Sequence, residues 1–273
     1  MAEKAGNEVR EMIASVSSAK NAFDLSGKTA LITGGGRGLG AAIAVAMAEC
    51  GADIAVFGRS DTSGTVERVQ KLGVKGKGFL CDVSRLEDVR RATGEAYSEF
   101  GNIDVLVNNA GISCVSELLD MDDALSDWYR VTGVDLNGTV HMTYHVAKQM
   151  RAGGKGGSII NISSMAGSAV IKTQAMSPYC CSKAAVNHFT RCMAWELGKH
   201  DIRVNAIAPG FVNTDLSDQI PKDHLRHIFE QSPLSRFGEP AEIGTAAVYL
   251  ASPAAAWITG AVLTVDGGYT LSC

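Results

Sequence analysis

Tyr179 and Lys183 are the residues whose types and spacing point most directly to chemistry. They lie four positions apart, in the segment Ser-Pro-Tyr-Cys-Cys-Ser-Lys, so on a helix their side chains share one face. A lysine ammonium beside a phenol stabilises the phenolate, and this lowers the pKa of the phenol. The pair therefore predicts a tyrosine that acts as a general acid or base near neutral pH. Because a solvated helix face can carry the same spacing, the interpretation depends on the other motifs of the chain.

A glycine-rich segment near the N-terminus predicts a phosphate-binding turn. The sequence Thr-Gly-Gly-Gly-Arg-Gly-Leu-Gly at 33–40 follows a strand-like apolar run and opens a helical pattern. Glycines permit a tight turn and a close approach of the backbone to a pyrophosphate, and a helix N-terminus offers free N–H groups to it. The glycine spacing differs from the GxGxxG fingerprint. The residues predicted to bind a cofactor here are Gly34, Arg37, Gly38, Leu39 and Gly40.

The residues after the second and third predicted strands bear on which dinucleotide is bound. Arg59 and Ser60 stand where an NAD site usually has an acidic residue for the ribose hydroxyl. Together with Arg37 in the glycine turn, Arg59 is predicted to hold a 2′-phosphate, which favours NADP(H). The alternative is that both are ordinary surface arginines. Asp82 and Val83 follow the third strand, where Asp82 is predicted either to meet the adenine edge or to cap the next helix.

Strand-like and helix-like segments alternate along the chain. Strands are predicted at 28–33, 53–58, 76–81, 103–107, 157–162, 203–208 and 261–265. Helices are predicted at 38–50, 61–72, 86–100, 122–150, 178–200 and 240–251, and a polar segment spans 213–236. Such alternation predicts an α/β fold, with a parallel sheet of about seven strands and helices on both faces. Because no linker interrupts it, we expect one domain over 22–273, preceded by an N-terminal appendage at 1–21.

Composition excludes several classes of protein. The 273 residues are 46% hydrophobic and 20% charged, with a net charge of −4, which argues against a nucleic-acid partner. No apolar run approaches the roughly 20 residues that cross a bilayer, so no membrane association is expected. The seven cysteines form no CxxC pair and the N-terminus carries no signal-like segment, so we expect a cytoplasmic protein. His141 and His145 share a helix face, but without a third ligand cluster they predict packing and not a metal site.

The motifs together resemble the short-chain dehydrogenase/reductase family over about residues 24–270. The resemblance rests on the glycine turn, on Asn-Asn-Ala-Gly at 108–111, on Asn137 within Val-Asp-Leu-Asn-Gly, on Ser164, on Tyr179 with Lys183, and on Pro209-Gly210 with Thr214. It implies a single-domain Rossmann-type doubly wound sheet and a catalytic set of Asn137, Ser164, Tyr179 and Lys183. Tyr179 would exchange a proton with the substrate oxygen and Ser164 would hold the substrate carbonyl. Lys183 would bind the nicotinamide ribose, and Asn137 would hold a water that links Lys183 to solvent.

The resemblance also implies further cofactor contacts, a partner and a substrate pocket. The implied cofactor contacts, beyond the residues named above, are Asn108, Asn109, Ala110, Gly111, Tyr179, Lys183, Pro209, Gly210, Val212 and Thr214. The partner would be a second copy of the chain, in a homotetramer or a dimer. Substrate contacts would come from 112–115, 165–174 and 211–220. The interval from Ser164 to Tyr179 is longer than in many members of the family, which leaves the shape of the pocket open.

The implied function is that of an NADP(H)-dependent oxidoreductase that interconverts a ketone and a secondary alcohol. The overall texture looks closest to polyol and ketose reductases, such as mannitol 2-dehydrogenase and sorbose reductase, so a ketose-like or polyol-like small molecule is expected. A reductase of secondary-metabolite ketones or of 3-oxoacyl thioesters is an alternative. A catalytically idle nucleotide-binding or scaffold protein is the alternative from another class.

Overall fold

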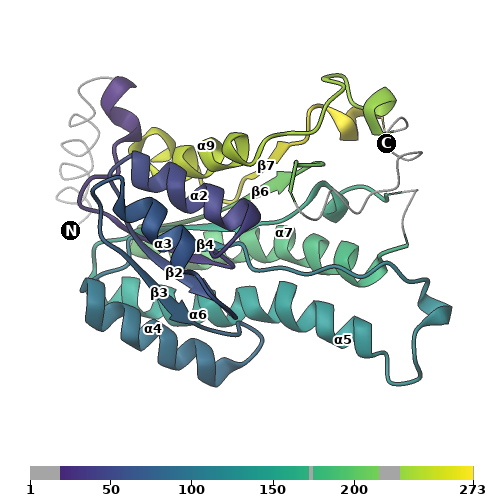
Figure 1. Ribbon diagram of the computed structural model, residues 1–273, viewed down its shortest axis with the longest axis horizontal. Helices are drawn as coiled ribbons and strands as arrows, with labels where there is room; N and C mark the ends of the chain where they lie inside the picture. The colour runs from purple at the N-terminus through teal and green to yellow at the C-terminus, as the bar shows by residue number, and fades with distance from the viewer. Residues whose placement is uncertain (1–18, 172–174, 215–227, 273) are drawn as a thin grey trace.

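The core of the molecule is one seven-stranded sheet whose strands are all parallel. A computed structural model describes residues 19–171, 175–214 and 228–272 (Figure 1). The sheet has the order β3-β2-β1-β4-β5-β6-β7. Its strands are β1 (Thr29–Thr33), β2 (Asp53–Gly58), β3 (Gly76–Leu80), β4 (Val105–Asn108), β5 (Gly157–Ile162), β6 (Ile202–Pro209) and β7 (Val262–Val265), each paired in parallel with its neighbour. The predicted α/β fold is confirmed.

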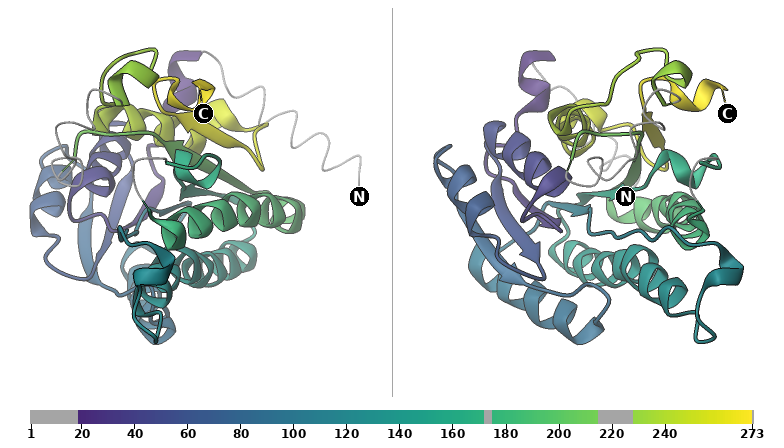
Figure 2. Two further views of the ribbon diagram at one scale, coloured as in Figure 1. Left: turned by 90° about the vertical axis from the view of Figure 1, so that its right-hand side faces the viewer. Right: turned by 45° about the vertical axis from the view of Figure 1, so that its right-hand side comes forward.

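Helices cover both faces of this sheet, as Figures 1 and 2 show. One face carries α2 (Gly38–Glu49), α3 (Ser63–Gln70) and α9 (Pro240–Ala251). The other carries α4 (Leu86–Phe100), α5 (Ser126–Thr132), α6 (Gly138–Gly153) and α7 (Ser177–Leu197). Parallel strands need such crossover helices, and the helices bury both faces of the sheet.

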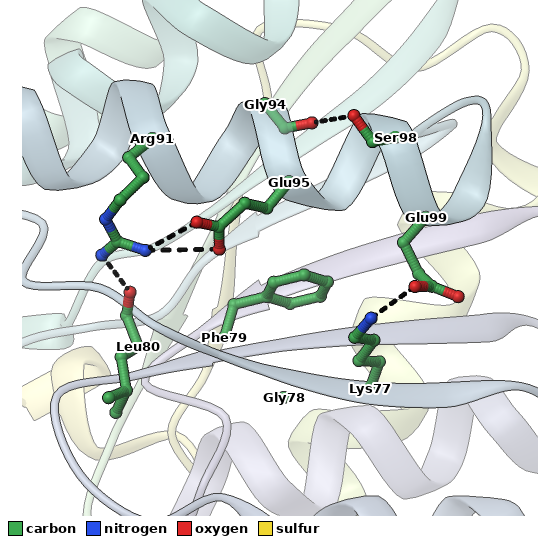
Figure 3. Close-up of a pocket in the computed structure, with 9 residues that line it drawn as sticks. All are labelled: Lys77, Gly78, Phe79, Leu80, Arg91, Gly94, Glu95, Ser98 and Glu99. Atoms are coloured by element: carbon green, nitrogen blue, oxygen red, sulfur yellow. Dashed lines mark hydrogen bonds and ion pairs between the residues drawn. The ribbon is translucent and has the colours of Figure 1, made fainter.

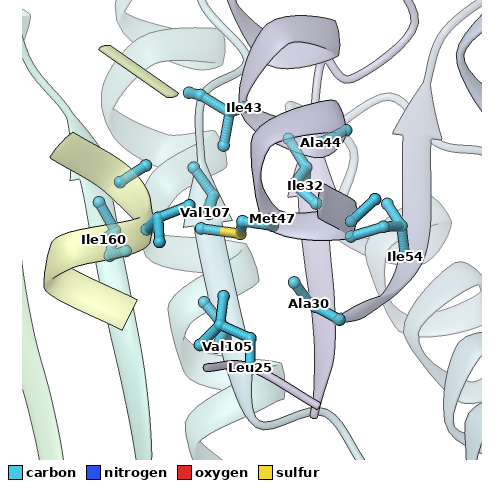
Figure 4. Packing of buried hydrophobic residues seen from close by; sticks show 14 of the residues in the cluster. Leu25, Ala30, Ile32, Ile43, Ala44, Met47, Ile54, Val105, Val107 and Ile160 are labelled. Carbon is cyan, nitrogen blue, oxygen red and sulfur yellow. The ribbon is translucent and has the colours of Figure 1, made fainter. Parts of the chain in front are cut away.

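Two apolar cores result, one on each face of the sheet. Ala30 and Ile32 of β1 pack under α2 and α9, in the cluster drawn in Figure 4, whereas Leu31 between them packs into the cluster of the opposite face. Successive side chains of a strand point to opposite faces, so one apolar run supplies both cores. This is why the central strands are continuously apolar in the sequence instead of alternating with polar residues.

Small residues set the distance between α2 and α9. A Cβ built on Gly244 of α9 would lie 2.9 Å from the Cβ of Ala46 and 3.2 Å from the carbonyl oxygen of Ala42, both on α2. By contrast, a Cβ built on Gly94 of α4 would meet no atom within 4 Å. The first glycine is therefore required for packing, while the second only weakens its helix.

The predicted helix at 122–150 is interrupted. The structure has a short 3₁₀ turn, η2 (Leu118–Asp120), then α5, a π-helical turn, η3 (Gly133–Asn137), and α6. A π-helical turn holds more residues than an α-helical turn, so it changes which side chains of the following residues face the protein. Such turns are frequent at functional sites.

The predicted N-terminal appendage lies mostly outside the described residues. Its last residues enter the 3₁₀ turn η1 (Ala19–Phe23), which contacts α9 through Phe23 and Tyr249, with ring centroids 6.3 Å apart. In the part of the chain that the structure describes, no helix has both the length and the apolar character needed to span a membrane.

Two glycine-to-alanine substitutions test this packing, because the same change is expected to have opposite effects. Gly94→Ala should raise the free energy of unfolding by about 0.5–1 kcal/mol, since alanine restricts the unfolded chain and favours the helix. Gly244→Ala should lower it by about 1–3 kcal/mol, because the new methyl group overpacks the contact between α2 and α9. Urea-induced unfolding followed by circular dichroism measures both. Equal effects of the two substitutions would contradict the described packing.

Candidate active site

The predicted site segments meet at one edge of the sheet. Because the strands are parallel, the residues that follow each strand emerge at the same edge. These are the glycine turn after β1, Arg59 after β2, Asp82 after β3, residues 109–111 after β4, and Ser164 after β5. β1 lies beside β4, although β2 and β3 separate them in sequence. At such a switch point, open α/β sheets bind their ligands.

The glycine turn is locked against the loop after β4. Asn109 donates from Nδ2 to the carbonyl oxygen of Thr33 at 2.9 Å, and the N–H of Ala110 donates to Oγ1 of Thr33 at 3.0 Å. A Cβ on Gly34 would lie 3.0 Å from the Cα of Ala110, and a Cβ on Gly40 would overlap the carbonyl oxygen of Gly34. The glycines therefore allow the two segments to touch, and the Asn109 side chain fixes them together.

The start of α2 fits the pyrophosphate of a dinucleotide. No side chain caps this helix and its first turn carries no acidic residue. Gly38, at its first position, is exposed with φ +53°, and a Cβ there would meet no atom within 4 Å. The first residue of a 12-residue helix is thus open to solvent, and the positive end of the helix dipole favours an anion there.

The two predicted phosphate-binding arginines belong to segments that touch each other. A Cβ on Gly36, next to Arg37, would lie 3.0 Å from the carbonyl oxygen of Asp61, which follows Arg59 and Ser60 in sequence. Arg37, Arg59 and Ser60 are exposed. The two arginine side chains therefore lie at the surface, beside the glycine turn.

Asp82 and Val83, after β3, are engaged in local hydrogen bonds. Oδ1 of Asp82 accepts from the N–H of Ser84 at 3.0 Å and from its hydroxyl at 2.7 Å, as expected for a turn before a helix. The carbonyl oxygen of Val83 lies 2.9 Å from Nδ1 of His141 on α6. His141 thus supports this loop, and the described residues contain no group of three residues that could hold a metal ion.

Lys183 and Tyr179 lie on the first turns of α7. Nζ of Lys183 is 5.4 Å from the ring centroid of Tyr179 and donates to the carbonyl oxygen of Ile162, at the end of β5, at 2.9 Å. The side chain of Lys183 is buried, whereas Tyr179 is half-buried. The predicted spacing therefore places both groups on one helix face, directed at the carboxyl end of β5.

Ser164 follows β5, two residues after Ile162, whose carbonyl oxygen binds Lys183. Its hydroxyl accepts from the N–H of Ala166 at 3.1 Å and begins the 3₁₀ turn η4 (Met165–Gly167). A Cβ on Gly167 would lie 2.7 Å from the carbonyl carbon of Lys183, so η4 packs directly on α7. The neighbouring Ser163 donates to the carbonyl oxygen of Lys183 at 3.2 Å and has a structural role. The structure thus packs the turn that Ser164 opens against α7, the helix that carries Tyr179 and Lys183.

Asn137, the fourth predicted member of this set, is the last residue of the π-helical turn η3. Its side chain is exposed, and the carboxylate of Asp135 lies at Lys183 instead, with Oδ2 3.3 Å from Nζ. Residues two apart on a helix point in nearly opposite directions, so burial of Asp135 turns Asn137 towards solvent. Asp135 is thus the residue of this turn that contacts Lys183, and the water-mediated role of Asn137 stays a prediction. The available signal was a single carboxylate between the apolar residues Val134 and Leu136.

The Asp135–Lys183 pair is a buried ion pair. Oδ1 of Asp135 also accepts the N–H of Ile112 at 2.9 Å. Burial raises the pKa of Asp135, against the opposing attraction of Lys183. Burial alone would lower the pKa of Lys183, but Asp135 and Tyr179 together raise it above its ordinary value. Lys183 therefore carries its charge at neutral pH.

Other predicted cofactor residues divide into structural and accessible groups. Asn108 is buried and donates to Oγ1 of Thr143 and to Oδ1 of Asn161, so its side chain joins β4 to its neighbours and does not line a cleft. Gly111 is exposed beside the ion pair. Pro209 ends β6.

The segment after Pro209 lies against the end of β7. Gly210 donates to the carbonyl oxygen of Val265 at 3.0 Å, and a Cβ on it would lie 2.7 Å from Asp266. Val212 pairs with Gly238, and Thr214 is half-buried.

An apolar cluster lies against Tyr179. It comprises Met165, Ala166, Ile171, Ile228 and Tyr269, with Phe211, Phe229 and Phe237 packed on it. Met165, Ile171 and Phe211 fall in the predicted substrate segments, whereas the residues from 228 onward were not predicted. The one signal within the polar segment 213–236 was the apolar pair Ile228 and Phe229. The predicted contacts at 172–174 and 215–220 lie outside the described residues.

A groove between β3 and α4 lies outside this site. Figure 3 shows that its charged residues pair with one another, Lys77 with Glu99 and Arg91 with Glu95, while Arg91 also donates to the carbonyl oxygen of Leu80 at 2.8 Å. Hydrogen bonds from Lys75 and Lys77 lower the pKa of Glu99 to about 2. The charges of this groove are satisfied within the protein.

Comparisons with known proteins agree with this arrangement. A family model described as enoyl-(acyl carrier protein) reductase matches residues 34–270. The sorbose reductase of Candida albicans is 36% identical over 250 residues, covering 91% of this chain and 89% of that protein.

Two solved structures are also similar. A gluconate 5-dehydrogenase from Burkholderia cenocepacia, in complex with NADP and tartrate, has a TM-score of 0.88 at 33% identity, covering 94% of this chain and 100% of that chain. A 7α-hydroxysteroid dehydrogenase complexed with NADH and 7-oxo glycochenodeoxycholic acid has a TM-score of 0.87 at 36% identity, covering 92% and 97%. The chain therefore belongs to the short-chain dehydrogenase/reductase family, oxidoreductases that act on CH–OH groups.

Proposed function

We propose that this protein interconverts a ketone and a secondary alcohol with NADP(H), using Tyr179 as general acid and base. The observation that carries the proposal is the position of Tyr179 beside the buried ammonium of Lys183, on a helix against which the turn opened by Ser164 packs, at the carboxyl end of β5. The three groups would be an unusual arrangement for a protein that only binds nucleotides, which argues against the catalytically idle alternative.

Each of the three side chains has a distinct task in carbonyl reduction. The cofactor, when bound, supplies the hydride. Negative charge then develops on the carbonyl oxygen, where the hydroxyl groups of Ser164 and Tyr179 stabilise it. Tyr179 donates its proton to that oxygen, and Lys183, fixed by Ile162 and Asp135, stabilises the phenolate that remains. In alcohol oxidation the same phenolate accepts the proton.

The cofactor would lie along the edge from β3 to β6. The N–H groups at the start of α2 would bind the pyrophosphate, with Gly34, Gly38, Leu39 and Gly40 allowing its approach. At one end, Asp82 and Val83 would face the adenine. At the other end, the ribose and nicotinamide would be faced by the residues after β4 and β6, which are Ala110, Gly111, Pro209, Gly210, Val212 and Thr214. Lys183 would bind the ribose hydroxyls. Asn109 would act through the glycine turn that it holds.

NADP(H) is proposed over NAD(H) because the strand end after β2 has no acidic residue and carries Arg59. Related structures hold either NADP or NADH, so membership of the family leaves the choice open. The exposed Arg37 and Arg59, on touching segments, support a 2′-phosphate site.

The proposed substrate is a ketose-like or polyol-like small molecule. Support comes from two relatives, a sorbose reductase and a gluconate 5-dehydrogenase in complex with tartrate, because sorbose, gluconate and tartrate are all polyhydroxylated. The apolar cluster around Met165 and Phe211 favours a second candidate, a bulkier apolar ketone of secondary metabolism. A 3-oxoacyl thioester is a further alternative.

A carbonyl panel tests the proposal. Purified protein is mixed with NADPH or NADH and with ketoses, sugar acids, acyl thioesters, diketones and bulky aromatic ketones, and the absorbance of the reduced nicotinamide is followed. We expect turnover with NADPH on ketoses or sugar acids. Turnover confined to aromatic ketones would favour the second candidate, and turnover only with NADH would contradict the proposed cofactor.

Arg59 gives a sharper test of cofactor choice. Arg59→Ala should raise the KM for NADPH by about tenfold or more, because a charge-assisted hydrogen bond to the 2′-phosphate is lost, and should leave the KM for NADH unchanged. Arg68→Ala, at an exposed arginine of α3, is the matched control. Equal changes for the two cofactors in Arg59→Ala would refute a 2′-phosphate contact.

We also propose a cytoplasmic homotetramer built from a single domain at 22–273. The continuous sheet supports one domain, and the six described cysteines are free thiols, which fits a reducing compartment. Trp195 on α7 is 85% exposed and Trp257, before β7, is 95% exposed, so the surface carries large apolar groups suited to interfaces.

Light scattering coupled to size-exclusion chromatography checks the assembly. We expect four times the mass of one chain, since two distinct interfaces generate a tetramer. A stable monomer at micromolar concentration would exclude it.

A further inference from the structure

The carboxylate of Asp135 is in direct contact with the lysine that serves Tyr179. Its side chain is fully buried, with Oδ2 3.3 Å from Nζ of Lys183 and Oδ1 accepting the N–H of Ile112 at 2.9 Å. Among the described residues, no neutral hydrogen-bond donor reaches Oδ2. The ammonium is therefore the group that compensates this buried oxygen.

The backbone around the pair is built to exclude solvent. The π-helical turn η3 holds Asp135 among its buried residues, and the side chains of Lys183 and Asp135 are 5% and 0% exposed. A Cβ on Gly111 would lie 3.3 Å from Oδ2 of Asp135 and 3.4 Å from Nζ of Lys183, so a larger residue would crowd both charged atoms. In such surroundings an electrostatic interaction is much stronger than in water.

The carboxylate of Asp135 changes how strongly Lys183 stabilises the phenolate form of Tyr179. An isolated ammonium beside Tyr179 would stabilise the phenolate with a full positive charge. Paired with a carboxylate, it acts as part of a neutral pair, so its effect on the phenol is weaker. The ammonium nevertheless stays in place, held by Asp135 on one side and by the carbonyl oxygen of Ile162 on the other.

We propose that Asp135 is a positioning residue that fixes Lys183 and sets the pH at which Tyr179 exchanges its proton. The carboxylate moves this exchange to higher pH than a neutral side chain at position 135 would. The kinetic form of this inference rests on the proposed function, but the ionisation of Tyr179 can be measured without any substrate.

Few other charged groups act on the pair formed by Asp135 and Lys183. Within the described residues, the charges that act on Lys183 are Asp135 and Tyr179, and the charge that acts on Asp135 is Lys183. On α5, which packs on α7, Asp127 and Arg130 are exposed and pair with each other at 2.6 Å. β5 and η4 contribute uncharged groups, the carbonyl oxygen of Ile162 and the hydroxyl of Ser164. The raised pKa of Lys183 agrees with a stable ion pair.

Asp135→Asn is the direct test, since the amide removes the charge and keeps an oxygen to accept the N–H of Ile112. The phenolate absorbance of the protein without ligands is titrated against pH, and the same titration of Tyr179→Phe is subtracted to isolate Tyr179. We expect the midpoint to fall by about 1 pH unit in Asp135→Asn. The pH profile of kcat/KM for alcohol oxidation should shift by the same amount. An unchanged or raised midpoint would overturn the proposal.

Two further variants separate this effect from a general structural one. Asp127→Asn removes an exposed carboxylate of α5 and should leave the midpoint unchanged. If Asp135→Asn does not fold, Asp135→Ser, a smaller neutral side chain, must produce the same downward shift, and failure to do so would equally overturn the proposal. A wild-type protein without turnover would refute the proposed function, while the absorbance titration would still decide the role of Asp135.

Discussion

The ammonium of Lys183 is the group on which the rest of the site depends. Burying a charge costs several kcal/mol unless other groups compensate it. Here the carbonyl oxygen of Ile162 and the carboxylate of Asp135 do so, from two different elements of the fold. A charge held in this way keeps one position relative to Tyr179, which a solvent-exposed lysine would not. The stability of the fold and the chemistry of the site thus share one interaction.

The parallel sheet brings these groups within reach of one another. β5 delivers the carbonyl oxygen of Ile162 and then Ser164, and the loop after β4 delivers Gly111 and Ile112. Two close approaches complete the arrangement. A Cβ on Gly167 would overlap the backbone of α7, and a Cβ on Gly111 would contact both charged atoms of the ion pair. The sequence around the site is therefore constrained by packing as well as by chemistry. On the far side of the sheet, the contact of α2 with α9 holds the glycine turn in position for a cofactor.

The fold could be predicted because its physical signals are local and repeated. Strands buried on both faces are continuously apolar, and the helices between them have the period of an amphipathic helix. Tyr179 and Lys183 could be predicted because a helix fixes the relation of residues four apart. The contact of Asp135 with Lys183 could not be predicted, because it depends on which face of η3 is buried, and the predicted uninterrupted helix did not specify that face.

Other features of the site depend on contacts between distant segments. Phe211, Phe237 and Tyr269 come together through ring contacts, with centroids 5.3–6.0 Å apart, that no local pattern encodes. The structural role of Asn108, buried between β4 and its neighbours, was hidden by its place in a motif that also contains accessible residues. Phe211 and Asn108 could be named from the sequence, but the direction in which each side chain points could not be predicted.

The most direct test of the account is Tyr179→Phe, with NADPH binding and ketone turnover measured on the same preparation. The phenylalanine keeps the ring beside Lys183 and removes only the hydroxyl group that exchanges the proton. Tyr249→Phe on α9, at a half-buried tyrosine outside the site, is the control. We predict that NADPH binding, followed by its fluorescence, stays within about twofold and that kcat falls by about a hundredfold or more. Turnover close to that of the wild type would contradict a mechanism centred on Tyr179 and Lys183.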